Sequence, residues 1–163
     1  MEYQSLKHTF DPVYDAESKI LILGSFPSVK SRENQFFYGH PQNRFWKVMA
    51  SVLDWEIPAT IEEKRAMLLK NHVAVWDVIA SCSIQGSSDT SIKDVVVNDF
   101  SRILENSKIE RIYVNGGKAY ELYHKYAEKV TGIKAIKLPS TSPANAAWSL
   151  ERLTITWREV ITI

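Results

Sequence analysis

Residues 38–46, which read Tyr-Gly-His-Pro-Gln-Asn-Arg-Phe-Trp, carry the side chains with the clearest potential for chemistry. They supply a flat ring at Tyr38, an imidazole at His40, an amide at Asn43 and a guanidinium at Arg44. Aromatic rings stack on heterocycles, and amide and guanidinium groups donate hydrogen bonds to oxygen and nitrogen acceptors. The set therefore favours a flat heterocycle bound beside a phosphate, and it does not suit a metal.

Apolar runs that are predicted to be buried strands must position this segment. They span residues 19–23, 73–78, 111–114 and 134–138, and each is rich in Val, Ile or Tyr. Half-exposed antiparallel strands alternate apolar and polar residues, and these runs are too continuous for that pattern. They are typical of a sheet that is covered on both faces.

Helical patterns separate the predicted strands. Phe45, Val48, Met49 and Val52 form one apolar stripe, with Asn43 as the predicted N-cap. Further helices are predicted over residues 61–71, 91–104 and 118–130, and from about residue 150 to the end. Strands that alternate with helices indicate an α/β fold with a parallel sheet and right-handed crossovers.

Ligand sites of such sheets lie beyond the carboxyl ends of the strands. The first predicted strand ends in a glycine turn at residues 24–27, which read Gly-Ser-Phe-Pro. Asp77 and Asn115 end the next two strands, and residues 140–145 follow the last one. All of these residues are therefore expected around one crevice, together with the 38–46 segment.

Length and composition limit the possible classes of protein. The 163 residues are predicted to form one domain over residues 1–163, large enough to bury a core without disulfides. The single cysteine, Cys82, excludes a disulfide framework and a four-cysteine metal site, and it favours a reducing, cytoplasmic compartment. The net charge of +1 gives no global attraction for nucleic acid, so such binding needs a local patch. No apolar run reaches the roughly 20 residues of a membrane span, and residues 1–5 lack the apolar core of a signal peptide.

Segments along nearly the whole chain resemble the uracil-DNA glycosylase superfamily, and within it the hypoxanthine-DNA (deoxyinosine) glycosylase branch called family 6. In order, they are Gly-Ser-Phe-Pro-Ser at 24–28, the 38–46 segment, Val-Trp-Asp-Val-Ile at 75–79 and Leu-Pro-Ser-Thr-Ser-Pro-Ala-Asn-Ala at 138–146. The string His-Pro-x-Asn-Arg-Phe-Trp is the most specific of them. It is also similar to the mismatch-specific uracil-DNA glycosylases.

The resemblance implies a three-layer α/β/α fold with a four-stranded parallel sheet. It implies a monofunctional DNA repair glycosylase that flips a deaminated base out of the helix and hydrolyses its N-glycosidic bond. Hypoxanthine is the preferred base, with uracil or xanthine as further possibilities. The expected partner is double-stranded or single-stranded DNA, the expected state is a monomer, and no membrane, metal or redox cofactor is expected. Lysine occurs only at the flanks of these segments, as Lys30 and Lys47, so Schiff-base chemistry is not favoured.

By the same resemblance, Asn43 is the catalytic residue. Many relatives carry Asn or Asp two residues after the glycine of the first motif, but Phe26 stands there in this chain and cannot orient water. The resemblance assigns this catalytic role to the Asn of His-Pro-x-Asn, which is Asn43. From the residues alone, a plain helix N-cap is the commoner role for such an asparagine, and the two roles are compatible.

Base binding is predicted for Gly24, Ser25, Phe26, Tyr38, Asp77 and Asn115, the first five from the resemblance and Asn115 from its place at the end of the third strand. Tyr38 matches the ring that stacks on the flipped base in the mismatch-specific relatives, and its alternative role is that of a core tyrosine. Asp77 stands where uracil-specific relatives often read the base with Asn. An ionised carboxylate only accepts, so Asp77 suits the ring N–H of hypoxanthine or uracil, and its alternative role is a helix cap or ion-pair partner. Asn115 precedes two glycines and has a turn residue as its alternative.

The predicted DNA contacts are Ser140, Thr141, Ser142 and Asn145, because short hydroxyl side chains and backbone N–H groups suit phosphates. Residues 145–148, Asn-Ala-Ala-Trp, are placed to enter the minor groove and hold the gap that a flipped base leaves. The alternative for Trp148 is a place in the core. The histidine that many relatives carry in the second motif is absent here, which fits weak or redirected activity on uracil.

Two other classes of function stay open from the sequence. A nucleotide-hydrolysing α/β enzyme would bind phosphates in the crevice, but the chain lacks a G-x-x-x-x-G-K-[ST] loop and an acidic metal cluster. A non-catalytic module for damaged or single-stranded DNA would stack bases on Tyr38 and Trp148.

Overall fold

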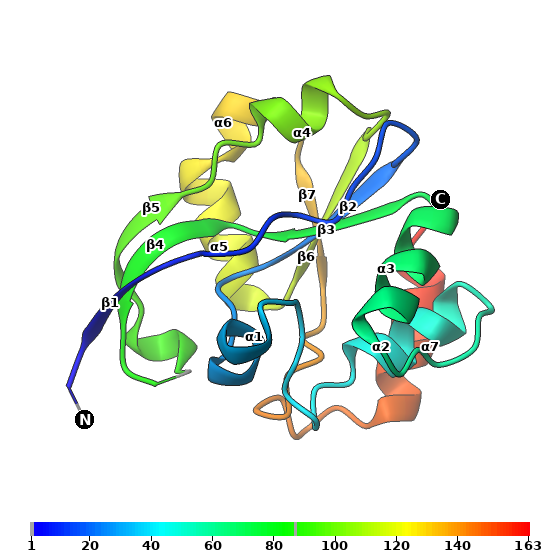
Figure 1. Cartoon of the computed structure of the whole chain (residues 1–163), viewed down its shortest axis with the longest axis horizontal. Helices are drawn as coiled ribbons and strands as arrows, with labels where there is room; N and C mark the ends of the chain where they lie inside the picture. The colour runs from blue at the N-terminus through cyan, green and yellow to red at the C-terminus, as the bar shows by residue number, and fades with distance from the viewer. Residues whose placement is uncertain (1, 87) are drawn as a thin grey trace.

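A parallel sheet forms the centre of the computed structural model, which describes residues 2–86 and 88–163. Within these ranges its four strands run in the order β3-β2-β6-β7 (Figure 1). They span Val73–Asp77 (β3), Ile20–Gly24 (β2), Arg111–Asn115 (β6) and Ala135–Leu138 (β7). The predicted strands are confirmed, each with its boundaries within about one residue.

Strand β2 shows why the apolar runs are continuous. Successive side chains of a strand point to opposite faces of the sheet. Ile20 and Ile22 accordingly join one apolar cluster, whereas Leu21 and Leu23 join another. All four side chains are fully buried, so both faces of the sheet are covered.

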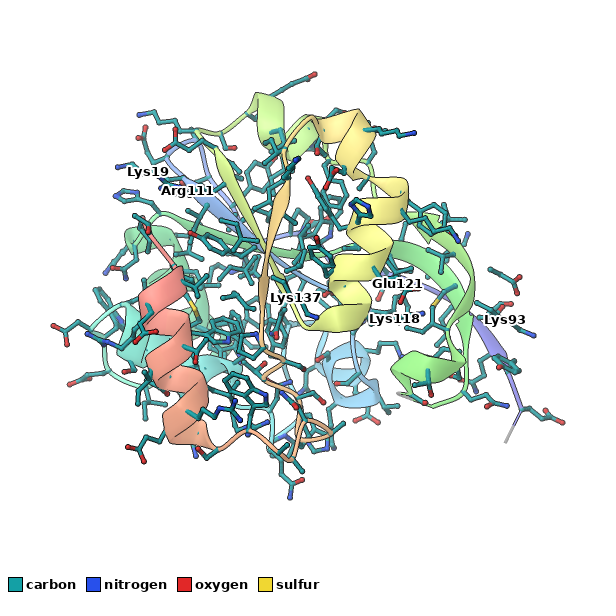
Figure 2. All side chains as sticks on the ribbon, turned by 180° about the vertical axis from the view of Figure 1, so that it is seen from behind. Lys19, Lys93, Arg111, Lys118, Glu121 and Lys137 are labelled. Carbon is teal, nitrogen blue, oxygen red and sulfur yellow. The ribbon has the colours of Figure 1, made fainter. Side chains whose placement is uncertain are left out.

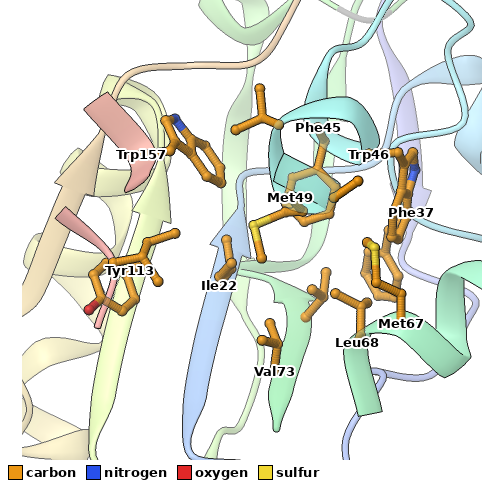
Figure 3. Close-up of a cluster of buried hydrophobic side chains, with 14 of the residues drawn as sticks. Ile22, Phe37, Phe45, Trp46, Met49, Met67, Leu68, Val73, Tyr113 and Trp157 are labelled. Atoms are coloured by element: carbon orange, nitrogen blue, oxygen red, sulfur yellow. The ribbon is translucent and has the colours of Figure 1, made fainter. Parts of the chain in front are cut away.

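Helices α2, α3 and α7 cover one face of the sheet. They span Phe45–Val52, Ile61–Lys70 and Leu150–Val160. Figure 3 shows Met49 of α2, Leu68 of α3 and Trp157 of α7 gathered around Ile22 of β2, in what is called the first cluster below. The helices predicted at these three places are confirmed.

Helices α4 and α5 cover the opposite face and the short helix α6 follows α5, so the three-layer α/β/α fold is confirmed. They span Ser101–Glu105, Gly117–Tyr126 and Glu128–Thr131. The helix predicted over residues 118–130 is interrupted at Ala127, which is buried and has a φ of −115°. Within residues 2–86 and 88–163, no helix is both long and apolar enough to cross a bilayer.

The helix predicted over residues 91–104 is wrong. After a 3-10 turn at Asp89–Ser91, the chain forms strand β5 (Lys93–Val97), and only Ser101–Glu105 is helical. In the described chain β5 belongs to an antiparallel sheet in the order β1-β4-β5, with β1 at Gln4–Lys7 and β4 at Ile79–Ile84. Val95 and Val97 pack against the core while Val96 is exposed, which is the period of a strand.

A short helix that was not predicted from the sequence follows the first motif. Helix α1 spans Val29–Asn34, and the hydroxyl of Ser28 caps it by accepting the N–H of Ser31 at 3.2 Å. The hydroxyl of Ser31 in turn accepts the N–H of Gly39 at 2.8 Å. This chain of contacts holds the beginning of the 38–46 segment close to the first motif.

Candidate functional site

A cavity of about 280 Å³, called the central pocket below, opens at the carboxyl ends of β2, β3 and β6. This volume is slightly below the range of about 300–1,000 Å³ that is usual for small-molecule sites. It brings together the predicted residues Gly24, Ser25, Phe26, Tyr38, Asn43, Asp77, Asn115, Ser140, Thr141 and Ser142. The remaining one, Asn145, lines a neighbouring recess.

The register of the parallel sheet explains this convergence. Gly24 at the end of β2 is paired with Asp77 at the end of β3, and Asn115 at the end of β6 is paired with Leu138 of β7. Parallel strands all end at the same edge of a sheet, so the loops that follow them meet there. Residues distant in the sequence thus share one pocket because their strands end side by side.

Asn43 is held at the start of α2 by its amide oxygen. Oδ1 accepts the backbone N–H of Phe45 at 2.9 Å and the hydroxyl of Thr141 at 2.8 Å. Arg44 occupies the formal N-cap position, one residue later than predicted, yet Asn43 still satisfies an N–H of the first turn. Both lone pairs of the oxygen are used, whereas the amide nitrogen has no hydrogen-bond partner within the described chain. Asn43 therefore offers a donor to the central pocket.

Thr141 fixes the orientation of the Asn43 amide. Its side chain is fully buried, and its hydroxyl donates its one proton to Asn43 while accepting Nδ2 of Asn115 at 3.0 Å. The Asn115 oxygen accepts the N–H of Thr141 at 3.1 Å. The Thr141 hydroxyl is consequently not available to a phosphate in this conformation. Asn115 retains one amide hydrogen for a ligand.

Arg44 fastens the loop after β7 to the start of α2. Its guanidinium donates to the carbonyl oxygens of Thr141 at 3.3 Å, Ser142 at 2.7 Å and Asn145 at 3.1 Å, and also to that of Trp148. These bonds use most of the five N–H donors of a guanidinium. The residue types of the 38–46 segment predicted this group beside a phosphate, but here it is a structural clamp.

Tyr38 offers one ring face to the central pocket. Its other face stacks on Phe45, with ring centroids 3.9 Å apart and 15° between the planes. The indole N–H of Trp46 donates to its carbonyl at 3.2 Å, and its φ of 51° lies in the left-handed region. That conformation costs energy in a residue other than glycine, so surrounding contacts must maintain it. A ligand can stack only on the ring face away from Phe45.

Gly24 allows the Asp77 carboxylate to approach the main chain closely. A β carbon at Gly24 would lie 2.5 Å from Oδ1 of Asp77 and 3.1 Å from the hydroxyl of Tyr38. The first distance is below any normal contact, so only glycine fits without moving the carboxylate. Gly24 thus determines where an acceptor oxygen enters the central pocket.

His8 contacts the same carboxylate, and it was not among the residues predicted from the sequence. Its Nε2 lies 2.8 Å from Oδ2 of Asp77, and the two side chains are 3% and 6% exposed. The residues are 69 positions apart, and no local pattern around His8 indicates the contact. Asp77 therefore has a side-chain partner, as its alternative role implied, and it also lines the central pocket.

Arg32 fixes the loop of the first motif. Its guanidinium donates to the carbonyls of Pro27 at 3.0 Å and Gly86 at 3.3 Å, and it lies 5.7 Å from the centre of the Phe26 ring. Burial lowers the pKa of the Arg32 guanidinium from its ordinary value. Phe26 packs into the core on the sheet face opposite to the first cluster. It presents an apolar surface to the central pocket, and this surface cannot hold a water molecule.

The hydroxyls of Ser140 and Ser142 remain able to donate. Oγ of Ser140 accepts the N–H of Ser142 at 3.1 Å, and Oγ of Ser142 accepts the N–H of Ala144 at 3.1 Å. Neither hydroxyl donates a hydrogen bond in the described chain, so both protons are available to an anion. Asn145 instead donates Nδ2 to the carbonyl of Ser140 at 3.0 Å.

The recess next to the central pocket is open and has a volume of about 610 Å³. It is lined in part by Gly116 and Gly117 at the start of α5 and by Lys137 of β7. Figure 2 shows Lys118 and Lys137 near the first turn of α5. A helix N-terminus and a lysine both attract anions, so the recess suits a phosphate group. Lys137 was not predicted as a contact, because its position beside α5 depends on the pairing of β6 with β7.

Trp148 packs against the first cluster, and the Arg152 guanidinium lies 3.7 Å from the centre of its ring. These contacts favour the core alternative for Trp148. The exposed residues of the loop are small, namely Ala144, Ala146 and Ala147.

Comparisons with known proteins agree with this geometry. The model of the family described as the uracil DNA glycosylase superfamily matches residues 12–160. A protein of Methanosarcina acetivorans named hypoxanthine DNA glycosylase is 37% identical over 149 residues, covering 90% of this chain and 93% of that protein. A protein of Methanosarcina barkeri with the same name is 33% identical over 141 residues, covering 85% and 88%. The solution NMR structure of a candidate uracil DNA glycosylase from Methanosarcina acetivorans superposes with a TM-score of 0.79 and 37% identity, covering 93% of each chain.

Proposed function

Because the chain belongs to the uracil-DNA glycosylase superfamily, we propose that it is a DNA glycosylase that excises hypoxanthine from DNA. The nucleotide is flipped out of the stack, its base enters the central pocket, and water hydrolyses the N-glycosidic bond. The observation that carries this proposal is the Asn43 amide, locked by its oxygen so that only its nitrogen serves the pocket. The names of the Methanosarcina relatives support hypoxanthine as the base.

The orientation of Asn43 narrows its chemical role. Cleavage passes through an oxocarbenium-like sugar, and the leaving base gains negative charge. A donor aimed at that charge stabilises the transition state. The Asn43 oxygen cannot accept a hydrogen bond from the attacking water, because the N–H of Phe45 and the hydroxyl of Thr141 already donate to both of its lone pairs. Asn43 therefore acts by donating from Nδ2 to the leaving base.

The base is held by groups of different kinds. The Tyr38 ring stacks on it, Asp77 accepts a hydrogen bond from its ring N–H, and the amide nitrogen of Asn115 donates its second hydrogen to it. Gly24, Ser25 and Phe26 form the wall of the first motif. Among the described residues that line the central pocket none is a lysine, which supports simple hydrolysis without a Schiff base.

The DNA backbone is held outside the central pocket. The hydroxyls of Ser140 and Ser142 donate to phosphate oxygens, and Lys137 with the first turn of α5 holds a further phosphate in the recess. This local patch replaces the global charge that the chain lacks. The protein acts as a monomeric single domain on double-stranded or single-stranded DNA inside the cell.

Excision of hypoxanthine is tested with a duplex that carries a single deoxyinosine. The purified protein is expected to leave alkali-labile sites in the presence of a metal chelator, with weaker or no release of uracil from a matched duplex. Comparable rates on the two bases contradict the preference, and loss of activity in the chelator contradicts the metal-free mechanism. A strand that is bound but stays intact would indicate a non-catalytic module instead.

Stacking by Tyr38 is tested by two substitutions. Tyr38→Ala is expected to weaken productive binding by about 1–3 kcal/mol, the usual contribution of one base stacked on an aromatic ring. Tyr38→Phe keeps the ring and its contact with Phe45, so it should be mild. Single-turnover excision at several enzyme concentrations separates binding from the chemical step. Equal damage by both substitutions would assign the role to the hydroxyl and not to the ring.

A further inference from the structure

His8 and Asp77 form a buried pair in which the two carboxylate oxygens of Asp77 face different neighbours. Oδ2 lies 2.8 Å from Nε2 of His8. An ionised carboxylate only accepts, so Nε2 is the donor, and Oδ2 is directed to the imidazole. Oδ1 lies on the other side, where a β carbon at Gly24 would be only 2.5 Å away. Gly24 and Asp77 both line the central pocket, so Oδ1 is the oxygen that a bound base meets.

Aromatic rings hold the imidazole in place. The ring of His8 lies 4.4 Å from that of Phe10, 5.9 Å from that of Phe37 and 6.2 Å from that of Phe26, measured between centroids. The backbone N–H of His8 donates to the carbonyl of Ala80 at 2.7 Å. Its side chain is only 3% exposed, so water does not compete for Nε2. The imidazole thus occupies Oδ2 as a fixed part of the pocket wall.

We propose that His8 is a specificity-determining positioning residue, which engages one oxygen of Asp77 so that only the other oxygen is offered unshared to the flipped base. This inference rests on the proposed excision of hypoxanthine. It adds a reason why the pocket rejects guanine, the normal base that resembles hypoxanthine most closely.

The two purines differ at one position of the edge that Asp77 reads. Hypoxanthine presents one donor, N1–H, beside a carbon-bound hydrogen at C2. Guanine presents N1–H and the adjacent amino group at C2, and a carboxylate with two free oxygens pairs with both donors. Oδ2 already accepts a hydrogen bond from the buried imidazole of His8, so the amino group of guanine has to share this oxygen with a fixed donor and gains a weaker hydrogen bond than those it loses to water. One unshared acceptor oxygen suits hypoxanthine, whereas two unshared oxygens would favour guanine.

Inhibition by free bases measures this discrimination apart from catalysis. Excision of deoxyinosine is followed in the presence of free hypoxanthine or free guanine, for wild type and for three variants. His8→Phe and His8→Leu remove the hydrogen-bond donor and place an apolar side chain of similar size among the aromatic rings. His8→Gln is the matched control, because its amide nitrogen donates from about the position of Nε2. Circular dichroism melting identifies the variants that fold.

Wild type and His8→Gln are expected to bind guanine about tenfold or more weakly than hypoxanthine. In whichever of His8→Phe and His8→Leu folds, this ratio should fall by about tenfold, because Oδ2 becomes free. A merely structural role would weaken both bases equally and leave the ratio unchanged, which would overturn the inference. Equal inhibition of wild type by the two bases would also overturn it, whatever the variants do. Wild type that releases no hypoxanthine would instead contradict the proposed function.

Discussion

Asn43→Asp is expected to lower hypoxanthine excision by about 10²–10³-fold, the usual loss when one transition-state donor is removed, with little change in the melting temperature. The aspartate keeps an oxygen that accepts the N–H of Phe45 and the hydroxyl of Thr141. It replaces only the amide nitrogen, so the donor to the leaving base is lost and a negative charge stands in its place. Single-turnover excision and thermal melting of the same preparations check both parts of the expectation.

Two further substitutions separate catalysis from helix capping. Asn43→Ser retains a capping oxygen and should be stable but inactive. Asn43→Ala should lose both roles, with a loss of stability of about 1 kcal/mol from the missing cap. Stable and active Asn43→Asp and Asn43→Ser proteins would mean that Asn43 only caps α2. The donor would then have to be sought elsewhere in the central pocket.

Gly24→Ala is expected to reduce kcat/KM for deoxyinosine by about 10²-fold or more, because a displacement of about 1 Å in a catalytic site has effects of this size. The new methyl group would lie 2.5 Å from Oδ1 of Asp77 and 3.1 Å from the Tyr38 hydroxyl. The carboxylate must move, and its bond to His8 must stretch or break. The methyl group also occupies the space where the edge of the base is read.

Gly132→Ala is the matched control for this substitution. Gly132 has a φ of +73°, and a β carbon there would have no atom of the described chain within 4 Å, so alanine strains the backbone without filling any site. It should lower the melting temperature while leaving the rate of excision unchanged. If Gly24→Ala is no less active than Gly132→Ala, the close approach of Asp77 to Gly24 does not matter for excision.

The central sheet could be predicted because its strands are buried on both faces. Ile20–Gly24 and Val73–Asp77 are continuous apolar runs, which leave little alternative to a covered parallel strand. The antiparallel sheet was not predictable in the same way. Ile79–Ile84 mixes serines with apolar residues, and Lys93–Val97 precedes a true helix, so their patterns resemble a loop and a helix start. Their pairing depends on contacts between distant segments and not on local periodicity.

Pocket residues that lie at the ends of the parallel strands could be predicted from the sequence. Residues from other parts of the chain that pack against the pocket could not. Asp77 and Asn115 end strands of one sheet, so their convergence follows from the topology. The resemblance proposed Asn43 as the catalytic residue, but no sequence pattern shows which atom of its amide is bonded within the protein. His8 lies 69 residues from Asp77 and outside the parallel sheet. Its role depends on how the antiparallel sheet is folded against the first motif.

The Arg44 clamp has a consequence for the order in which the protein becomes active. The residues that it joins, Arg44 and the loop from Thr141 to Trp148, are separated by about 97–104 positions. Contacts of such long range form late, because the intervening chain must first be ordered. During synthesis, the segment that carries Asn43 therefore leaves the ribosome long before the loop that orients its amide. On the proposed role of Asn43, a chain that ends before this loop is expected to be inactive.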